Sequence, residues 1–181
     1  MLEQKPLTIR DEPGEARTSL VQALRRHRYP VVAEASDASS PAGTRRIFLR
    51  FPSDLALLAT ITDYVMKRIG LVWSPSADYF GALNIALSEA LINAIKHGNN
   101  SDPSKLVQFT IEMNQDEARF IVENEGDGFN VNDIPHPRDP ENLLKSSGRG
   151  VLMIKNIMDE VRYDNDGKRL TMIKRHENSR P

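Results

Sequence analysis

The segment that most constrains the fold is IALSEALINAIKHGNN, residues 85–100. Its apolar residues recur at helical spacing and continue a pattern that begins a few residues earlier, so we predict a helix with one face buried in a core. Gly98 and the asparagine that follows it predict where this helix ends. The buried stripe is expected to consist of Leu83, Ala86, Leu87, Ala90, Leu91 and Ala94.

The segments on both sides of this helix predict a sheet and two more helices. RRIFLRF, from Arg45, alternates like a strand, and a helical pattern capped by Asp54 follows it and ends at Gly70. Residues 105–124 predict one hairpin, and a second is predicted around Asp166-Gly167, after the short amphipathic helix VLMIKNIMDEV. The order β, α, α, β, β, loop, α, β, β predicts helices on one face of a mixed or antiparallel sheet.

Length and composition allow one core domain with flanking segments. Of the 181 residues, 39% are apolar and 27% are charged, which is ordinary for a single globular domain. We predict a loosely ordered extension over residues 1–44, because this region contains a Pro- and Ser-containing polar run without sustained periodicity. The domain itself is expected over residues 45–176, and residues 177–181 are expected to form a tail.

The charge balance and residue content argue against several classes of function. A net charge of -1 gives no basis for bulk attraction to nucleic acid or to an anionic membrane. The N-terminus lacks an apolar signal core, and no run approaches the ~18 apolar residues of a membrane helix. The absence of cysteine excludes disulfides, and the four histidines are too scattered for a zinc site. We therefore expect a cytoplasmic protein without direct nucleic-acid or membrane contact.

The predicted long helix carries a line of polar residues at four-residue spacing. Glu89, Asn93 and His97 share one face beside the apolar stripe, and Lys96 lies close to its C-terminal end. A carboxylate at such a boundary suits a general base, and an amide oxygen suits Mg²⁺, which takes few protein ligands. The alternative interpretation is a solvated helix face with a histidine favoured by the helix dipole.

Two glycine-containing segments follow that could approach a ligand with their backbone. ENEGDGF places Gly126 and Gly128 directly after a predicted strand, although a simple turn is the better explanation when such a pair is taken alone. SSGRGVLMI opens the later helix with Gly148 and Gly150, whose free N–H groups at a helix start suit a phosphate. A glycine-rich hinge is the alternative there. Between the two segments, residues 126–147 form a loop that is long enough to be a candidate lid.

Taken in this order, the polar-line helix ending in HGN, the strand ending in NxGxG and the loop closed by SGRG resemble the three nucleotide-binding boxes of the GHKL ATPase superfamily. The resemblance runs from about Arg45 to Lys174, and it is most specific in EALINAIKHGN and SGRGVLMIKNIMDEV. Within the superfamily the chain is most similar to the small serine-protein kinases that act as bacterial anti-sigma factors. The resemblance implies a two-layer α/β (α+β) sandwich, with helices on one face of a mixed sheet: the histidine-kinase-like ATPase (Bergerat) fold.

The resemblance also implies roles for individual residues. Glu89 takes the position of the catalytic base, and Asn93 takes that of the Mg²⁺ ligand. Lys96 is expected near the phosphates of bound ATP. The glycines of the two boxes and one cation are expected along the nucleotide, with Gly126 and Gly128 under the adenine end and Gly148, Arg149 and Gly150 over the phosphates.

One position departs from the pattern of this superfamily. Its first glycine box begins with an aspartate that accepts a hydrogen bond from the adenine amino group, and Asn124 stands there in this chain. An asparagine carbonyl can accept the same bond, but without the charge assistance that makes such bonds roughly twice as strong. Glu123 and Glu125 do not replace the aspartate, because alternate residues of a strand point to opposite faces.

The resemblance implies a serine/threonine-protein kinase that uses ATP and Mg²⁺ and acts as an anti-sigma factor. Its implied partners are a sigma factor, an anti-anti-sigma protein of the STAS type that it phosphorylates, and a second copy of itself in a homodimer. A non-catalytic regulator on the same fold, with weak or no ATP binding, is the alternative that Asn124 raises. A detached ATP-binding module of a histidine kinase is a third interpretation, but the sequence shows no phospho-acceptor helix before Arg45.

Overall fold

A computed structural model of the chain describes residues 38–39, 43–128 and 149–179. In this part the chain forms a six-stranded sheet with the strand order β1-β2-β3-β4-β6-β5. The strands are β1 (Ala38–Ser39), β2 (Arg45–Pro52), β3 (Leu106–Met113), β4 (Glu117–Asn124), β5 (Glu160–Asp164) and β6 (Arg169–Arg175). The helices are the 3₁₀ turns η1 (Leu55–Leu57) and η5 (Glu177–Ser179), the α-helices α2 (Leu58–Gly70), α3 (Ala77–Ile92) and α4 (Arg149–Ile157), and the π-helix η2 (Asn93–Gly98).

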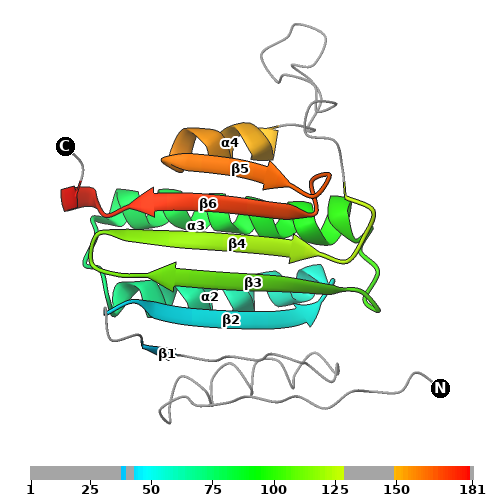
Figure 1. Ribbon diagram of the computed structural model, residues 1–181, viewed down its shortest axis with the longest axis horizontal. Coiled ribbons are helices and arrows are strands. Elements are labelled where there is room, and N and C mark those ends of the chain that lie inside the picture. Colours follow the sequence, from blue (N-terminus) through cyan, green and yellow to red (C-terminus); the bar gives the residue numbers. More distant parts are fainter. Residues whose placement is uncertain (1–37, 40–42, 129–148, 180–181) are drawn as a thin grey trace, which may run out of the picture.

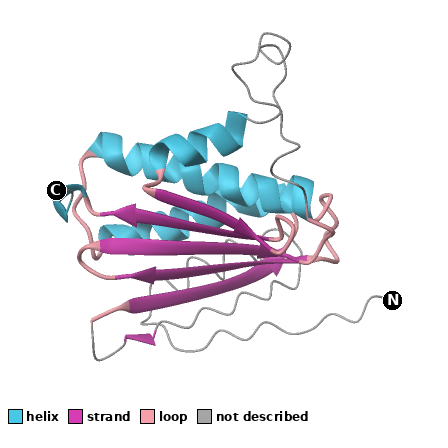
Figure 2. Ribbon diagram, turned by 45° about the horizontal axis from the view of Figure 1, so that its top comes forward, coloured by secondary structure: helices cyan, strands magenta, loops and turns pink. Residues whose placement is uncertain are grey.

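The described helices lie on one face of the sheet, as the sequence predicts. Figure 1 shows α2 and α3 behind the strands, and Figure 2 shows the two layers separately. Both predicted hairpins form, one from β3 and β4 and one from β5 and β6. All pairings between the described strands are antiparallel, which is one of the two arrangements that the element order predicts; the mixed sheet that the resemblance implies does not form in this part of the chain. The reason is that β6 returns beside β4 in the opposite direction, and no crossover brings two strands together in parallel.

The core lies between the helices and the inner face of the sheet. Inward residues alternate along the strands, as in β3, where Val107, Phe109 and Ile111 are fully buried. The predicted stripe of α3 is buried along its whole length. Trp73 closes one end of the core, and its indole N–H donates to the Asn114 carbonyl at 2.8 Å. These contacts fix α3 against the sheet.

The C-terminal end of α3 departs from ordinary helix geometry. Residues 93–98 form the π-helix η2, in which hydrogen bonds span five residues instead of four. The four-residue spacing that places Glu89 and Asn93 on one face therefore does not extend to His97, which is exposed. Single π turns often occur at functional sites. Here the π turn begins at Asn93, the predicted Mg²⁺ ligand.

Asn99 ties the end of η2 to the sheet. Its side chain is fully buried, and its Nδ2 donates to the Ser53 hydroxyl at 2.6 Å and to the Leu106 carbonyl at 3.0 Å. The Ser53 hydroxyl in turn donates to the Lys105 carbonyl at 3.0 Å. The asparagine after Gly98 thus has a structural role, because it holds the HGN segment against β2 and β3.

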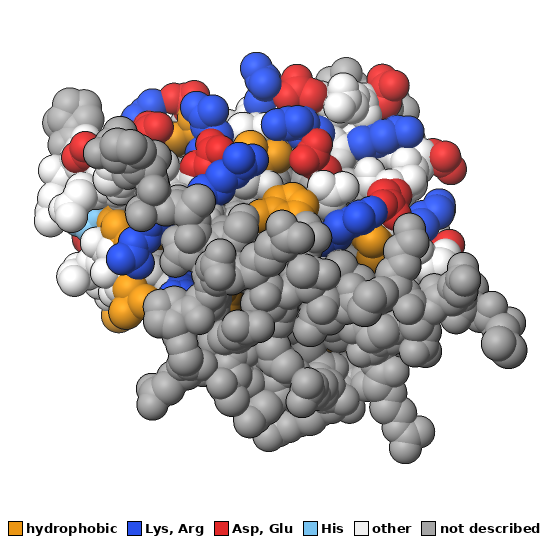
Figure 3. Space-filling model, turned by 60° about the horizontal axis from the view of Figure 1, so that its bottom comes forward, with side chains coloured by type: hydrophobic (Ala, Val, Ile, Leu, Met, Phe, Trp, Pro, Cys, Tyr) orange, Lys and Arg blue, Asp and Glu red, His pale blue; other side chains and the backbone are white. Residues whose placement is uncertain are grey.

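The outer face of the sheet carries cross-strand ladders of charged and apolar residues. Arg46 pairs with Glu112 at 3.5 Å, and Arg169 pairs with Glu123 at 3.2 Å. Figure 3 shows basic and acidic side chains interspersed on the described part of the surface in that view. Exposed pairs of this kind contribute little, typically ~0.2–1 kcal/mol each, so they keep this face polar more than they stabilise the fold.

Residues from both predicted flanking segments contact the domain. Ala38–Ser39 pair with the start of β2, and the Glu177 carboxylate accepts hydrogen bonds from the backbone N–H and hydroxyl of Ser76, both at 2.8 Å. Ser76 is the N-cap of α3. Among the described helices, none combines the length and the apolar content that a bilayer span requires.

Candidate functional site

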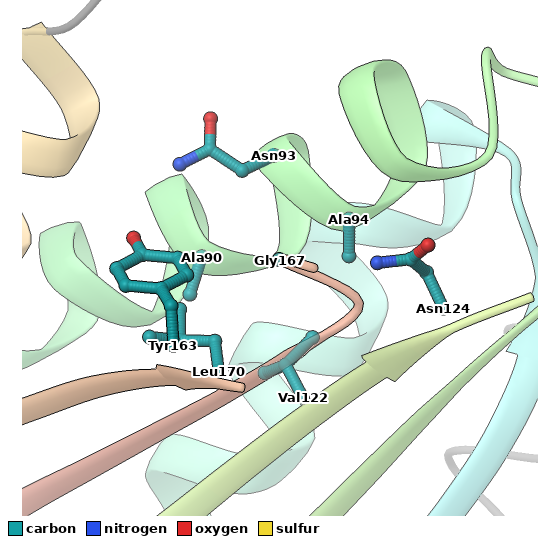
Figure 4. Close-up of a pocket in the computed structure, with 8 residues that line it drawn as sticks. All are labelled: Ala90, Asn93, Ala94, Val122, Asn124, Tyr163, Gly167 and Leu170. Carbon is teal, nitrogen blue, oxygen red and sulfur yellow. The ribbon is translucent and has the colours of Figure 1, made fainter. Parts of the chain in front are cut away.

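A small cavity lies between the end of α3, the end of β4 and the β5–β6 hairpin. The space enclosed between these elements is about 10 Å³, roughly what a single water molecule needs. A larger ligand could enter only if the lining side chains moved apart. Figure 4 shows the lining residues, with Asn124 opposite Ala94 and with Tyr163 and Leu170 on the strands below the helix. The lining consists of Ala90, Asn93, Ala94, Val122, Asn124, Tyr163, Gly167 and Leu170.

Two of the predicted site residues line this cavity, and each carries a buried polar atom without a hydrogen-bond partner. The atoms are Nδ2 of Asn93 and Oδ1 of Asn124. Leaving such an atom unsatisfied costs about 1–3 kcal/mol, so buried polar atoms in native proteins nearly always have a protein, water or ligand partner. The cavity therefore has unused hydrogen-bonding capacity at two points, one on the helix and one on the sheet.

Asn124 is held in place from both sides. Its backbone N–H and its Nδ2 both donate to the Lys168 carbonyl, at 3.0 Å and 3.2 Å. On the other side, a Cβ built on Gly98 would lie 2.4 Å from the Asn124 Cγ, so any larger residue there would have to displace the Asn124 side chain. As predicted, the glutamates on either side point to the other face of the sheet, where Glu123 pairs with Arg169 and Glu125 with Arg50.

The glycines of ENEGDGF approach the protein's own backbone closely. A Cβ on Gly126 would lie 1.7 Å from the Gly98 carbonyl oxygen. Gly128 has φ +77°, and a Cβ there would lie 2.2 Å from the Asp166 carbonyl oxygen. Both glycines thus join the end of β4 to neighbouring segments, to η2 and to the turn of the β5–β6 hairpin. They do not line the cavity, and their predicted role under an adenine ring stays a prediction.

Glu89 lies against the first turn of α4. A Cβ built on Gly150 would lie 2.4 Å from Oε2 of Glu89, so glycine leaves the space that this carboxylate occupies. The helix start is also where free N–H groups and the helix dipole favour an anion. Glu89 is half-buried, whereas Arg149, the first residue of α4, is exposed. The structure thus brings together the predicted base and the second predicted glycine box.

Three other sequence predictions have different outcomes. Lys96 is exposed on η2 and does not line the cavity, so its predicted approach to phosphates stays a prediction. Gly148 lies outside the described residues, and so does most of the candidate lid, residues 129–147.

The sequence did not indicate the lining residues of the β5–β6 hairpin, Tyr163, Gly167 and Leu170. Burial raises the pKa of Tyr163 to about 12, so its phenol stays protonated over the physiological range. The Asp166-Gly167 dipeptide predicts the turn itself, but only the insertion of β6 between β4 and β5 brings that turn beside α3. No local pattern carries that information.

The described residues contain no group of three or more acidic or histidine side chains that could bind a metal ion. Any divalent cation held by these residues would therefore share its coordination with ligand oxygens and water. Mg²⁺ is commonly bound in this way, through one or two protein groups and substrate phosphates.

Comparison with known families decides the class of this fold. A model described as the histidine kinase-like ATPase domain matches residues 51–174, which is most of the chain. The chain belongs to this family. Membership confirms the GHKL resemblance and the fold that it implies, and an ATPase domain implies the use of ATP.

Individual relatives within the histidine-kinase-like ATPase family carry more specific names. The chain is 33% identical over 130 residues to the serine-protein kinase RsbW of Bacillus licheniformis, covering 68% of this chain and 79% of the relative. It is 25% identical over 118 residues to the same-named protein of Oceanobacillus iheyensis, covering 62% and 72%. It is 31% identical over 103 residues to the anti-sigma F factor of Geobacillus stearothermophilus, covering 55% and 69%. These names support the anti-sigma serine-kinase group within the family.

Proposed function

We propose that this protein is an ATP-dependent serine/threonine-protein kinase that acts as an anti-sigma factor and phosphorylates an anti-anti-sigma protein of the STAS type. Relatives named serine-protein kinase and anti-sigma factor support the class. The observation that carries the proposal is the position of Glu89 against Gly150, because it joins an acid to the helix start that the phosphates would occupy.

The unsatisfied atoms of the cavity fit a bound nucleotide. Nδ2 of Asn93 and Oδ1 of Asn124 have no protein partner, and a purine ring with its sugar and phosphates offers both donors and acceptors. The base end would bind between Asn124 and α3 after the small cavity there widens, and the phosphates would extend past Asn93 toward Glu89 and α4. The order of these residues along the site, from Asn124 to Gly150, thus matches the order of groups in ATP.

The carboxylate of Glu89 would act on the substrate serine. One of its oxygens would accept the hydroxyl proton as the serine oxygen attacks, which is the ordinary role of a general base. Gly150 leaves room for that carboxylate, and the start of α4 beside it favours negative charge. Bound ATP would supply the phosphoryl group: the serine oxygen would bond to the γ-phosphorus while the bond from that phosphorus to the bridging oxygen breaks, and ADP would leave. Mg²⁺ would offset the phosphate charge, with the side-chain oxygen of Asn93 as its protein ligand.

Lys96, Arg149 and the glycine at 148 are proposed to complete the phosphate end of the site. The two cations are exposed on η2 and at the start of α4, so each can turn toward a ligand without first leaving a packed core. Their charges would offset those of the phosphates, in the manner of the positive groups found in other phosphoryl-transfer sites.

The proposed partners are a sigma factor and the STAS-type substrate, and a homodimer is proposed as the assembly. The basis is the names of the relatives and the resemblance of the sequence to that group. The anti-anti-sigma protein would compete with the sigma factor for binding to this protein, and its binding would release the sigma factor. Phosphorylation of the anti-anti-sigma protein would end that competition.

A second candidate is a non-catalytic regulator that binds its partners but binds ATP weakly. Asn124 is the observation that favours it, because a neutral amide lacks the charge that strengthens a hydrogen bond to the adenine amino group. The two candidates share the fold and the partners, and they differ in whether phosphate is transferred.

Substitution of Glu89 by Gln separates them. The test measures transfer from radiolabelled Mg·ATP to a purified STAS-domain substrate, with sigma-factor binding followed by calorimetry. We expect E89Q to lower transfer by at least about 100-fold, the range of general-base catalysis, with sigma-factor binding retained. Glu112→Gln is the matched control, since Glu112 lies on the outer face of the sheet, paired with Arg46. Equal transfer by E89Q and wild type would refute the role of Glu89, and no transfer by wild type would favour the regulator.

A further inference from the structure

We infer that the solvent side of the contact between α3 and α4 is the docking surface for the protein that this chain phosphorylates. Its apolar anchors are Ile85 on α3 and Met153 on α4. The inference rests on the proposed kinase function and concerns how the protein substrate is held. It requires the substrate to expose an apolar side chain close to its acceptor serine.

Large apolar side chains are exposed at four positions in the part of the chain that the structure describes, and two of these lie on the helices that meet at the proposed base. Ile85 keeps 47% of its surface exposed, and Met153 keeps 45%. Leu55 precedes α2 and Leu71 follows it, so this second pair lies at opposite ends of one helix. Single exposed apolar residues are normal, whereas exposed apolar residues that gather in one place mark an interaction site.

The two helices run in opposite directions, so the anchors lie along the same stretch of their contact. At one end, glycine at position 150 leaves the space that the Glu89 carboxylate occupies. At the other end, Nζ of Lys174 donates to the Ile157 carbonyl at the end of α4 and lies 5.0 Å from the ring centroid of Tyr79, in the first turn of α3. Figure 1 shows α3 and α4 in this arrangement. Both anchors lie between these two ends.

Helical spacing places both anchors at the solvent edge of the contact. Ile85 is four residues before the proposed base, about 6 Å along α3, and Met153 is three residues after the glycine beside that base, about 4.5 Å along α4. The residue after each anchor, Ala86 on α3 and Ile154 on α4, is fully buried. The anchors thus border the packed contact on its outer side, about one helical turn from the reacting groups.

The surroundings of the anchors resemble those of a protein interface. On the side away from the site, their neighbours at helical spacing are Gly81 on α3 and Asn156 on α4, which are exposed and uncharged. On the side of the reacting groups, the neighbours four residues away are Glu89 and Arg149. An apolar centre without charges, bordered by polar residues, is the usual make-up of a protein–protein contact.

The access route to Glu89 decides which protein covers this surface. Glu89 is half-buried, with the core behind α3 and the first turn of α4 beside it, so a serine of another protein reaches it from the solvent side. A specific interface covers about 800 Å² on each partner, far more than one helical turn around that serine. A substrate in place therefore covers both anchors. A second copy of this chain bound there would close the route to the base.

Steady-state transfer from Mg·ATP to a purified STAS-domain protein tests the inference with the full chain. The variants are Ile85→Gln and Met153→Gln, and Leu71→Gln is the matched control, because Leu71 is 68% exposed at the far end of α2. We expect I85Q and M153Q each to raise the KM for the protein substrate at least about tenfold, the usual effect of losing an interface anchor. Their kcat and their KM for ATP should stay near the wild-type values, because only substrate binding is lost. L71Q should behave as wild type.

A second arm changes the substrate and leaves this chain intact. Replacing the exposed apolar residue nearest the acceptor serine by Gln should raise the KM of wild type at least about tenfold but add little to that of M153Q, because both changes remove the same contact. Fully additive effects contradict the inference. So does a KM within about threefold of wild type in I85Q and M153Q, whose folding is checked by circular dichroism. A weaker dimer or weaker sigma-factor binding with unchanged KM would assign the surface to another partner and refute the inference.

Failure of the proposed function gives a different result. If wild type transfers no phosphate, the kinase function is wrong, and this inference falls with it. If wild type transfers phosphate and the variants keep its KM for the protein substrate, the kinase function stands and only the docking surface is refuted.

Discussion

The contact between Gly126 and Gly98 predicts that replacing Gly126 by Ala severely destabilises the protein. The added Cβ would lie 1.7 Å from the Gly98 carbonyl oxygen and 2.6 Å from its carbonyl carbon. Both are backbone atoms, so no side-chain rotation relieves the clash. The end of β4 and the π-helix η2 must separate until the Cβ–oxygen distance grows from 1.7 Å to at least 3.0 Å.

The expected cost follows from what this separation disturbs. Overpacking costs about 1–3 kcal/mol, and more where neighbouring atoms cannot move. The Glu125 carboxylate, one residue away, accepts from the Leu106 N–H at 2.9 Å and pairs with Arg50 at 2.9 Å. Loss of the hydrogen bond to Leu106 adds roughly 1 kcal/mol, and loss of the exposed ion pair adds at most about that much. We therefore expect G126A to lower the free energy of unfolding by about 3–5 kcal/mol, a large part of the ~5–15 kcal/mol of a typical domain.

Urea denaturation followed by circular dichroism measures this loss, and Gly81→Ala is the control. Gly81 is exposed within α3, and a Cβ there meets nothing within 4 Å. Because alanine is favoured over glycine in a helix by about 0.8–1.0 kcal/mol, G81A should be slightly more stable than wild type. A G126A protein within about 1 kcal/mol of wild type would refute the backbone contact.

Three further predictions concern other parts of the structure. Gly150→Ala places a Cβ 2.4 Å from Oε2 of Glu89, whose flexible side chain can move aside, so a urea melt should show a stability loss below about 1 kcal/mol. Phosphate transfer should be about 100-fold slower, because the proposed base is displaced, and an unchanged transfer rate would argue against that role. Burial raises the pKa of Tyr163 to about 12 from an ordinary value of 10, so between pH 10 and pH 12 the phenol of the unfolded chain loses a proton that the folded protein keeps. The free energy of unfolding of wild type should therefore fall by up to about 2.7 kcal/mol as the pH rises through this range, and that of Y163F should fall by correspondingly less. Identical pH profiles of the two proteins would contradict the burial of this hydroxyl. Lys174 is buried, donates to the Ile157 carbonyl and lies 3.8 Å from the Asp159 carboxylate. K174M should therefore lower the free energy of unfolding in urea by about 2–3 kcal/mol, and a K174M protein as stable as wild type would show that these contacts contribute nothing.

Much of the fold could be predicted from the sequence because local patterns determine it. The stripe of α3 has helical spacing, and every member of it is buried. The turns at residues 114–116 and at Asp166-Gly167 mark both hairpins. The alternation along β4 predicts that Asn124 and its neighbouring glutamates point to opposite faces, and the ion pairs of Glu123 and Glu125 agree with that.

Other features could not be predicted, because they depend on contacts between distant segments. The position of β6 between β4 and β5 makes the described sheet antiparallel and brings Tyr163 to the cavity. The π turn at residues 93–98 changes which residues share a face with Asn93, and the sequence showed only ordinary helical spacing there. Nothing in the sequence indicated that the backbone of Gly98 and Asp166 lies against the glycines after β4.

The most direct test of the nucleotide site is calorimetric titration of wild type and of Asn93→Ala with Mg·ATP. We predict that wild type binds with a dissociation constant between about 1 μM and 1 mM, the range in which enzymes usually hold their substrates. Asn93→Ala should bind at least about tenfold more weakly, because the proposed metal ligand and one of the two unsatisfied cavity atoms are lost. No binding by folded wild type at saturating Mg·ATP, or equal affinity in the two proteins, would contradict a nucleotide held between α3 and the end of β4.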